Sequence, residues 1–327
     1  MTRPGRSDAG CARRWAAVLC LCLGVVVGLA PAICAAQAPE PPDLPAPYHG
    51  TPIDKALKAR EWPRAEELLV AAIERQPDSP GLLSVLGSVF LIEKKPLNAA
   101  IAIKKAEALA PLDDRSRFTL VLAYIALNHG DWARPELEKL IASDPSNPGY
   151  DYWLGRLDYD AGQYASAVKR FQKVIDAEPD SVRAYDNLGL CYEALNQPDD
   201  AVMSYRKAVE LNRTAQSQSA WPPLNLGILL RNRGDLKEAE ALLREAAKYE
   251  DHLAQPWYQL GVLLEQVNRP DDAIAELKRA TERDATYAEP YYALARIYRK
   301  QNRKAEADDA LATFERLHDA RRATPRP

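Results

Sequence analysis

A 34-residue period runs through most of this 327-residue chain and limits its fold more than any other feature. Three kinds of position recur at that spacing, independently of one another. They are a mostly glycine position at Gly87, Val121, Gly155 and Gly189, an alanine position at Ala65, Ala99, Ala133, Ala167 and Ala201, and a proline position at Pro77, Pro111, Pro145 and Pro179. After a four-residue insertion, the first position continues as Gly227, Gly261 and Ala295. A period of this size indicates a repeat architecture, with copies that start at Ala46, Pro80, Asp114, Pro148, Val182, Ala220, Ala254 and Ala288.

The pattern within each copy predicts two short helices joined by a turn. With Val182 counted as position 1, positions 4, 7, 8 and 11 fall on one helix face. Gly or Ala at position 8 and Ala at position 20 let the two helices approach closely, and larger residues at 4, 11 and 24 fill the space beside them. Gly, Asn or Asp near positions 15 and 16 predicts the turn, and Pro at position 32 ends the second helix. Helices this short are marginal alone, so neighbouring copies must stabilise them.

The copy at residues 181–212, SVRAYDNLGLCYEALNQPDDAVMSYRKAVELN, resembles the tetratricopeptide repeat (TPR) family in period and pattern. The resemblance implies an all-α, right-handed superhelical solenoid of about eight helix-turn-helix repeats. It also implies a concave groove, lined by the first helices, that holds extended peptides or partner helices. The repeats lie at 46–79, 80–113, 114–147, 148–181, 182–219, 220–253, 254–287 and 288–321, with a tail at 322–327.

Four repeats depart from the regular pattern. The first has Pro52 and Ile53 where the Leu-Gly pair belongs, and we interpret it as a cap. In the third, residues 128–132 predict a turn about two residues longer than usual and a correspondingly shorter second helix. The insertion at 212–221 predicts a polar, exposed loop. The last repeat is expected to end near Arg321 without a separate capping helix.

Residues 1–38 are interpreted as a signal peptide. Four arginines precede an apolar run over residues 16–30, and residues 36–38 have the small-x-small form of a signal peptidase site. We expect cleavage after Ala38 or nearby, for example after Ala36, and export to the periplasm or secretion. The alternative is an uncleaved membrane anchor with the solenoid outside the cytoplasm, since residues 15–36 are nearly long enough to span. The prolines of residues 39–52 predict an extended linker that overlaps the first repeat.

The cysteines and the net charge argue against a disulfide, a cysteine nucleophile and a nucleic-acid partner. Four of the five cysteines lie in the signal peptide, so cleavage leaves Cys191 alone and no internal disulfide can form. Cys191 occupies a position that is apolar in the other repeats, so we expect a buried packing residue and not a nucleophile. The chain has 43 Lys and Arg against 46 Asp and Glu, a net charge of −3, and cleavage makes it more negative. This balance argues against nucleic acid as a partner.

The sequence carries no catalytic or metal-binding motif of a known kind. HExxH, GxSxG, a phosphate-binding Gly-rich loop and cysteine pairs at metal spacing are all absent. The acidic pairs at 199–200 and 271–272 each follow a proline at the start of a second helix, where carboxylates stabilise the helix N-terminus. We therefore predict no catalytic residue, no metal and no cofactor. An enzyme with an unfamiliar site is the alternative to this non-enzymatic interpretation.

The expected binding surface is the face of each first helix opposite its packing positions. Positions 5, 9 and 12 lie there, and they carry aromatic and aliphatic residues with a few charges. A surface helix without a partner would be polar at these positions, and exposed apolar surface of this kind marks binding sites. The alternative is that neighbouring repeats bury part of the face themselves, position 9 above all. We predict peptide contacts at Tyr152, Arg156, Tyr159, Tyr258 and Tyr292.

Position 6 carries an amide in three successive repeats, at Asn187, Asn225 and Gln259. Some TPR proteins, the O-linked N-acetylglucosamine transferases among them, hold a peptide backbone through a ladder of Asn side chains. The resemblance implies a three-residue ladder here, bounded by Trp153 and Ala293. The carboxylate clamp of chaperone-binding TPR domains needs Lys and Asn at positions 5 and 9 of one repeat, and no repeat has both.

These patterns predict a non-enzymatic protein-interaction scaffold that binds an extended peptide or a partner helix in its groove. A more specific alternative is an envelope-assembly adaptor in pilus, polysaccharide or outer-membrane biogenesis, because exported TPR proteins often resemble this. The expected partner is a protein or peptide, and a membrane only if the N-terminal segment is not cleaved. The residues do not select the partner, the pathway or the oligomeric state.

Overall fold

The computed structural model describes residues 43–323, and all regular secondary structure in that range is helical. The chain divides into two units, one ending at Ser143 and the other beginning at Asp144. The predicted all-α class is confirmed. The first unit contains the 3-10 helix η1 (Ala46–Tyr48) and the helices α1 (Pro52–Lys58), α2 (Trp62–Arg75), α3 (Pro80–Ile92), α4 (Pro96–Leu109), α5 (Asp114–Ala126) and α6 (Gly130–Ser143). The second contains α7 (Pro148–Asp160), α8 (Tyr164–Ala177), α9 (Val182–Ala194), α10 (Pro198–Thr214), α11 (Trp221–Arg233), α12 (Leu236–Tyr249), α13 (Ala254–Gln266), α14 (Pro270–Arg283), α15 (Ala288–Lys300) and α16 (Lys304–Ala323).

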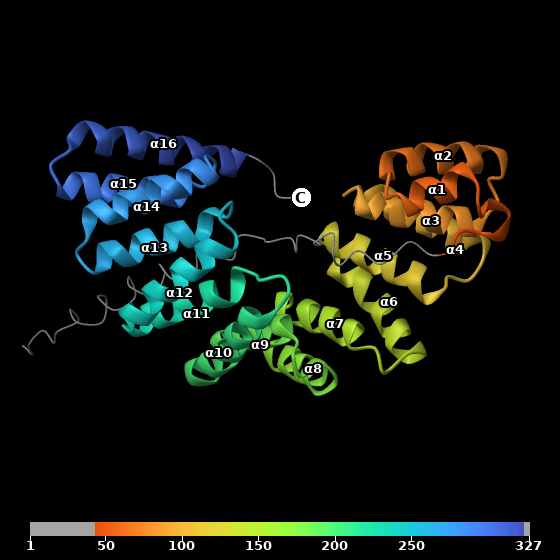
Figure 1. Cartoon of the computed structure of the whole chain (residues 1–327), viewed down its shortest axis with the longest axis horizontal. Helices are drawn as coiled ribbons and strands as arrows, with labels where there is room; N and C mark the ends of the chain where they lie inside the picture. Colours follow the sequence, from red (N-terminus) through yellow and green to blue (C-terminus); the bar gives the residue numbers. More distant parts are fainter. Residues whose placement is uncertain (1–42, 324–327) are drawn as a thin grey trace, which may run out of the picture. The chain divides into compact units, whose positions relative to one another are not determined.

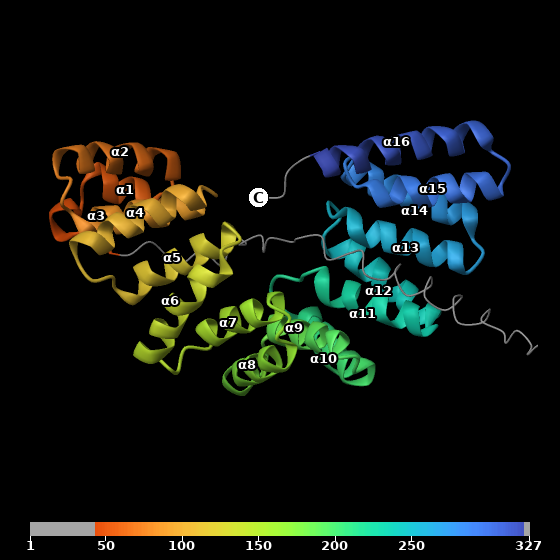
Figure 2. The same ribbon diagram turned by 180° about the vertical axis from the view of Figure 1, so that it is seen from behind.

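Helices that follow one another in the chain pack as hairpins, such as α3 with α4, α9 with α10 and α13 with α14 (Figure 1). The view from behind shows the same hairpins stacked in chain order within each unit (Figure 2). Helices α3, α5, α7, α9, α13 and α15 begin at the first residue predicted for their repeats, and α11 begins one residue later. The repeat period therefore locates the helices closely.

Glycine at position 8 allows the two helices of a hairpin to approach, as predicted. A Cβ built on Gly189 of α9 would lie 2.4 Å from Cε1 of Tyr205 on α10, and one on Gly155 would lie 3.1 Å from the Phe171 ring. Tyr205 and Phe171 are fully buried at position 24 of their repeats. The small residue on the first helix thus makes room for the large side chain on the second.

Every turn between the two helices of a repeat is built in the same way. Position 15 has a positive φ in all eight repeats, at Arg60, Lys94, Asn128, Gly162, Asn196, Gly234, Asn268 and Asn302. The next residue donates its N–H to the carbonyl five residues earlier, as from Gln197 to Tyr192 at 2.8 Å. This left-handed residue with a six-to-one hydrogen bond satisfies the carbonyls at the end of the first helix.

The predictions for the third repeat are wrong. The backbone N–H of His129 donates to the carbonyl of Tyr124, as the corresponding residue does in every other turn. Helix α6 is 14 residues long, as is α4. The motif suggested a longer turn because Gly130 follows the usual turn position by two residues. Asn128 itself adopts the left-handed conformation, with a φ of 61°, so Gly130 begins the helix.

The insertion mostly lengthens a helix and forms only a short loop. Helix α10 has 17 residues, against 14 in α8. Buried Asn212 closes the loop, because its Nδ2 donates to the carbonyl of Ser219 and its Oδ1 accepts from the Ser219 N–H, both at 2.8 Å. The predicted exposed loop is therefore confined to a few residues around Gln216–Gln218, which are exposed.

The N-terminal part of the described chain packs against the first unit. Leu44 is buried, its carbonyl bonds His49 Nε2 at 2.6 Å, and the Tyr48 hydroxyl donates to Gln76 at 2.8 Å. The predicted extended linker thus does not hold for residues 43–51. The predicted signal peptide at 1–38 lies outside the described residues, as does the end of the tail. Helix α16 continues to Ala323, two residues past the predicted end.

Candidate functional site

The first helices of the second unit, α7, α9, α11, α13 and α15, lie beside one another, each in contact with the next. We call the side that carries positions 5, 6, 9 and 12 of these five helices the first-helix face. All eight predicted binding residues belong to it. Hydrogen bonds or ion pairs join each pair of adjacent helices across this face, and the bond between α7 and α9 is the longest of those described below, at 3.4 Å.

The α7 end of the face is the most buried part. Tyr152 is buried, with its ring edge-on to Trp153 and Phe171 at centroid distances of 5.6 and 5.8 Å. The Arg183 guanidinium lies 5.0 Å from the same ring centroid. Most of the Tyr152 surface is thus used within the protein, which favours the packing alternative for this residue. Tyr159 is half-buried and stands 5.4 Å from the Tyr164 ring.

The three amides predicted to form a ladder already make hydrogen bonds within the protein. Asn187 donates through Nδ2 to the Arg183 carbonyl at 2.8 Å and to the Tyr152 hydroxyl at 3.4 Å. Asn225 donates through Nδ2 to Asp186 at 3.0 Å, and Gln259 accepts from Arg231 at 2.6 Å. Within residues 43–323, the Asn187 Oδ1, Asn225 Oδ1 and Gln259 Nε2 atoms make no hydrogen bond. Each of the three amides therefore keeps one atom for a ligand.

Asp186 is a member of this face that sequence reasoning did not select. It is 8% exposed, and burial raises the pKa of its carboxyl to about 7. The hydrogen bond from Asn225 and the charge of Arg156 lower this pKa, while the charge of Glu193 raises it. The titratable and charged groups around Asp186 thus come from α7, α9 and α10. On α10, the charge of Asp186 contributes to raising the pKa of Tyr205. The sequence did contain a signal for Asp186, because position 5 is aromatic or apolar in most of the other repeats and is acidic only here.

Arg156, between Tyr152 and Tyr159 on α7, is the least satisfied side chain of the face. Its Nε is buried and has no hydrogen-bond partner among residues 43–323. Burying a guanidinium donor without a partner costs free energy. The position is therefore suited to an acceptor that the described chain does not supply.

The α15 end of the face is exposed and rich in cations. Arg296 and Lys300 both pair with Glu265 of α13. Tyr258 packs against Tyr287 at a centroid distance of 5.2 Å, while Tyr292 is 49% exposed. The face thus changes along the unit from buried and hydrogen-bonded at α7 to open and basic at α15.

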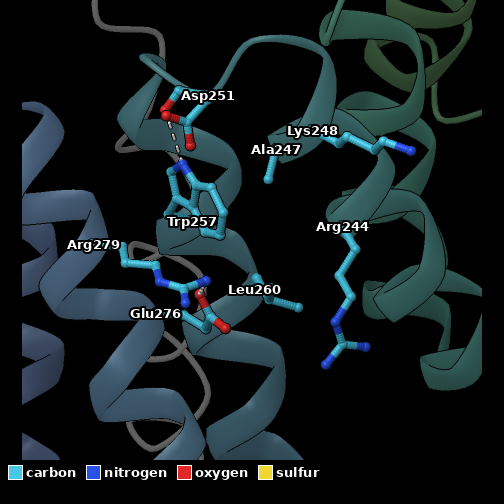
Figure 3. A pocket seen from close by; sticks show the side chains of 8 residues that line it. All are labelled: Arg244, Ala247, Lys248, Asp251, Trp257, Leu260, Glu276 and Arg279. Atoms are coloured by element: carbon cyan, nitrogen blue, oxygen red, sulfur yellow. Dashed lines mark hydrogen bonds and ion pairs between the residues drawn. The ribbon is translucent and has the colours of Figure 1, made fainter.

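A hollow of about 440 Å³ lies away from the first-helix face, between α12, α13 and α14. Figure 3 shows Trp257 and Leu260 of α13 between the α12 side chains and the Glu276–Arg279 pair of α14. The Trp257 Nε1 donates to the Asp251 carbonyl at 3.2 Å, and the Arg279 guanidinium lies 5.1 Å from the Trp257 ring. The polar groups of this hollow are thus mostly engaged with one another.

The remaining polar residues singled out in the sequence have structural roles. Cys191 is buried as predicted, and burial raises the pKa of its thiol to about 12. Asp199 pairs with Arg233 at 2.7 Å, and Asp272 with Arg269 at 2.6 Å. Within residues 43–323, no three side chains of His, Cys, Asp or Glu are grouped to hold a metal ion. In the same range, no helix is both long and apolar enough to cross a membrane.

Comparison with known families decides what kind of repeat this is. Three family models, each described as tetratricopeptide repeat, match residues 53–114 and 152–219, residues 230–286, and residues 288–314. The chain belongs to the tetratricopeptide repeat family. The TPR family and fold are typically those of non-enzymatic scaffolds that bind other proteins.

Individual TPR proteins resemble the chain over part of its length. BBSome complex member BBS4 of Bos taurus is 25% identical over 171 residues, which is 52% of this chain and 26% of that protein. The chain thus spans about a quarter of the length of the curated relatives it matches. A TPR protein from Parabacteroides merdae superposes with a TM-score of 0.61 at 17% identity, over 74% of this chain and 94% of the other. Yeast Tom70 gives 0.58 at 20% identity, over 82% and 57%. These solved TPR structures show the fold alone.

Proposed function

We propose that the first-helix face binds an extended peptide or a partner helix. The observation that carries this proposal is the buried Nε of Arg156 without a hydrogen-bond partner among residues 43–323. A carbonyl or carboxylate of a bound peptide would accept from this guanidinium once the Arg156 side chain turns to expose its Nε, and this would remove the cost of leaving that donor unpaired. The family supports the proposal, because TPR proteins generally bind protein partners.

Other groups on the same face fit a peptide backbone. Asn225 offers Oδ1 as an acceptor and Gln259 offers Nε2 as a donor, so the two together match the alternating groups of an extended chain. Asn187 likewise offers its Oδ1 as an acceptor, while its Nδ2 is bonded within the protein to the Arg183 carbonyl and the Tyr152 hydroxyl. We therefore propose a ladder of three amides, in which Nδ2 of Asn187 also joins α9 to α7. The half-buried rings of Tyr159 and Tyr258 would provide apolar contacts on either side.

The experiment selects peptides from a random 12-residue library with the full chain and then measures each affinity by fluorescence anisotropy. We expect Arg156→Gln to weaken binding about tenfold, because a charge-assisted hydrogen bond is lost. Lys169→Gln is the matched control, since it removes one positive charge from an exposed site on the second helix of the same repeat. Equal affinity of the wild type and Arg156→Gln for every selected peptide would place binding elsewhere.

We also propose that the chain is exported through residues 1–38, on the basis of the sequence alone. Mass spectrometry of the protein from its native host should find an N-terminus near Pro39. An intact Met1 in a membrane fraction would show an anchor instead. The more specific role as an envelope-assembly adaptor depends on this export and stays a prediction. That the protein binds without catalysing a reaction is likewise our proposal.

A further inference from the structure

The open end of the first-helix face contains a hollow of about 340 Å³. It is shaped by α15, with one residue from α16. Its lining consists of Tyr292, Ala295, Arg296, Arg299, Lys300 and Leu311. Three of these six side chains are cationic, and none is acidic.

The cations of this hollow have too few acidic partners. Arg296 and Lys300 share one carboxylate, Glu265. Burial of Glu265 would raise its pKa, but the hydrogen bonds from these two cations outweigh burial and lower it. The Arg299 guanidinium makes no ion pair or hydrogen bond within residues 43–323, and the residue is exposed. One ionised carboxylate thus faces three positive charges.

Apolar surface lies directly beside these charges. Tyr292 is 49% exposed, with its ring packed on Phe314 at a centroid distance of 5.2 Å. Leu311 is half-buried and Ala295 is buried at the floor. An exposed tyrosine next to basic side chains is typical of the anchoring contacts in protein interfaces.

We propose that this hollow binds an acidic peptide segment with an apolar side chain next to its carboxylates. Charge complementarity identifies the occupant, because a neutral or basic segment would leave the excess of cations unpaired. The carboxylates would pair with Arg299 and with the donors of Arg296 and Lys300 that Glu265 does not occupy, and the apolar side chain would lie on Tyr292. This inference rests on the proposed function, since α15 is the last helix of the same face. It adds the chemistry of the partner.

The test uses the full chain and three fluorescein-labelled 12-residue peptides. One consists of Asp and Glu with a central Leu, the second replaces the acids by Asn and Gln, and the third replaces them by Lys. We expect the anisotropy to rise on addition of the protein only for the acidic peptide. The affinity for this peptide should fall as the salt concentration is raised. Arg299→Gln and Tyr292→Ser should each weaken binding about tenfold. The thermal melt of Arg299→Gln should be unchanged, because the Arg299 side chain is exposed, so its loss of binding cannot be attributed to unfolding.

Lys248→Gln is the control for non-specific attraction. It removes one charge from an exposed lysine of the other hollow, which makes no ion pair within residues 43–323. If it weakens the acidic peptide as much as Arg299→Gln does, the proposal is overturned. Tighter binding of a 12-residue oligothymidylate than of the acidic peptide would overturn it as well.

The two proposals can fail separately. If library peptides are lost with Arg156→Gln while the acidic peptide binds Arg299→Gln as well as it binds the wild type, the proposed function stands and the acidic hollow is ruled out. If no peptide of any charge binds, the proposed function fails and the inference fails with it. If the acidic peptide is lost with Arg299→Gln but not with Arg156→Gln, its main contacts lie at α15.

Discussion

Gly189→Ala should lower the free energy of unfolding by about 3 kcal/mol, at the upper end of overpacking effects. The new Cβ would lie 2.4 Å from Cε1 of Tyr205. The Tyr205 ring is fully buried and cannot swing away, because its hydroxyl donates to Glu193 at 2.7 Å. Helices α9 and α10 must therefore move apart. Urea unfolding followed by far-UV circular dichroism measures the loss, and hydrogen exchange should rise first in these two helices.

Two comparisons isolate the cause of this loss. Gly227→Ala places its Cβ 3.0 Å from Cδ2 and Cγ of Leu243. This contact is looser than the 2.4 Å at Gly189, so the neighbour must give by only a few tenths of an ångström and the cost should be about 1 kcal/mol. In a Tyr205→Leu background, Gly189→Ala should also cost much less than it does alone, because the ring is gone. An undiminished cost in that background would mean that the helix backbone, and not Tyr205, sets the limit.

The stability of the second unit should fall by about 2 to 3 kcal/mol between pH 5 and pH 8 through Asp186 alone. Burial raises the folded pKa of this carboxyl to about 7, from an ordinary value of 3.8. Because the folded pKa is raised, the native state holds its proton where the unfolded state has lost it. The contribution is therefore complete below the unfolded pKa and is lost as the pH rises through about 7.

Asp186→Asn tests this expectation directly. The amide stays neutral and still offers an oxygen to Nδ2 of Asn225, so the variant should lose most of the pH slope and be more stable than the wild type at pH 8. Asp180→Asn is the control, since Asp180 is exposed and makes no hydrogen bond within residues 43–323. Urea titrations at several pH values give the slopes. The same slope in the wild type and Asp186→Asn would contradict the assignment.

The period in the sequence located the helices because the same local contacts recur in every repeat. Position 8 meets position 24 of the same repeat, as Gly189 meets Tyr205, and position 15 makes each turn. These contacts lie within one hairpin, so spacing alone reveals them. The third turn was misjudged because Asn128 takes the left-handed role that Gly130 seemed to claim.

The site was less accessible to sequence reasoning because its contacts join different repeats. The eight predicted residues do lie on one side of the first helices, but the pattern could not show which are covered. Tyr152 is enclosed by Phe171 and Arg183, while Tyr292 is open. The burial of Asp186 depends on Asn225, which lies 39 residues further along the chain. No periodicity encodes such a pairing.

The contact between positions 8 and 24 also couples the ways in which copies of the repeat can diverge. A Cβ on Gly189 would lie 2.4 Å from the Tyr205 ring and one on Gly261 would lie 2.6 Å from Cγ of Leu277, so neither glycine has room for a Cβ until the facing side chain changes. Glycine facing leucine occurs at Gly227 and Gly261, and a larger residue occupies the glycine position at Val121 and Ala295. A larger residue at position 8 therefore requires an accompanying change in the side chain that faces it from position 24. Glycine facing a ring, glycine facing leucine and a larger residue at position 8 all occur in this one chain.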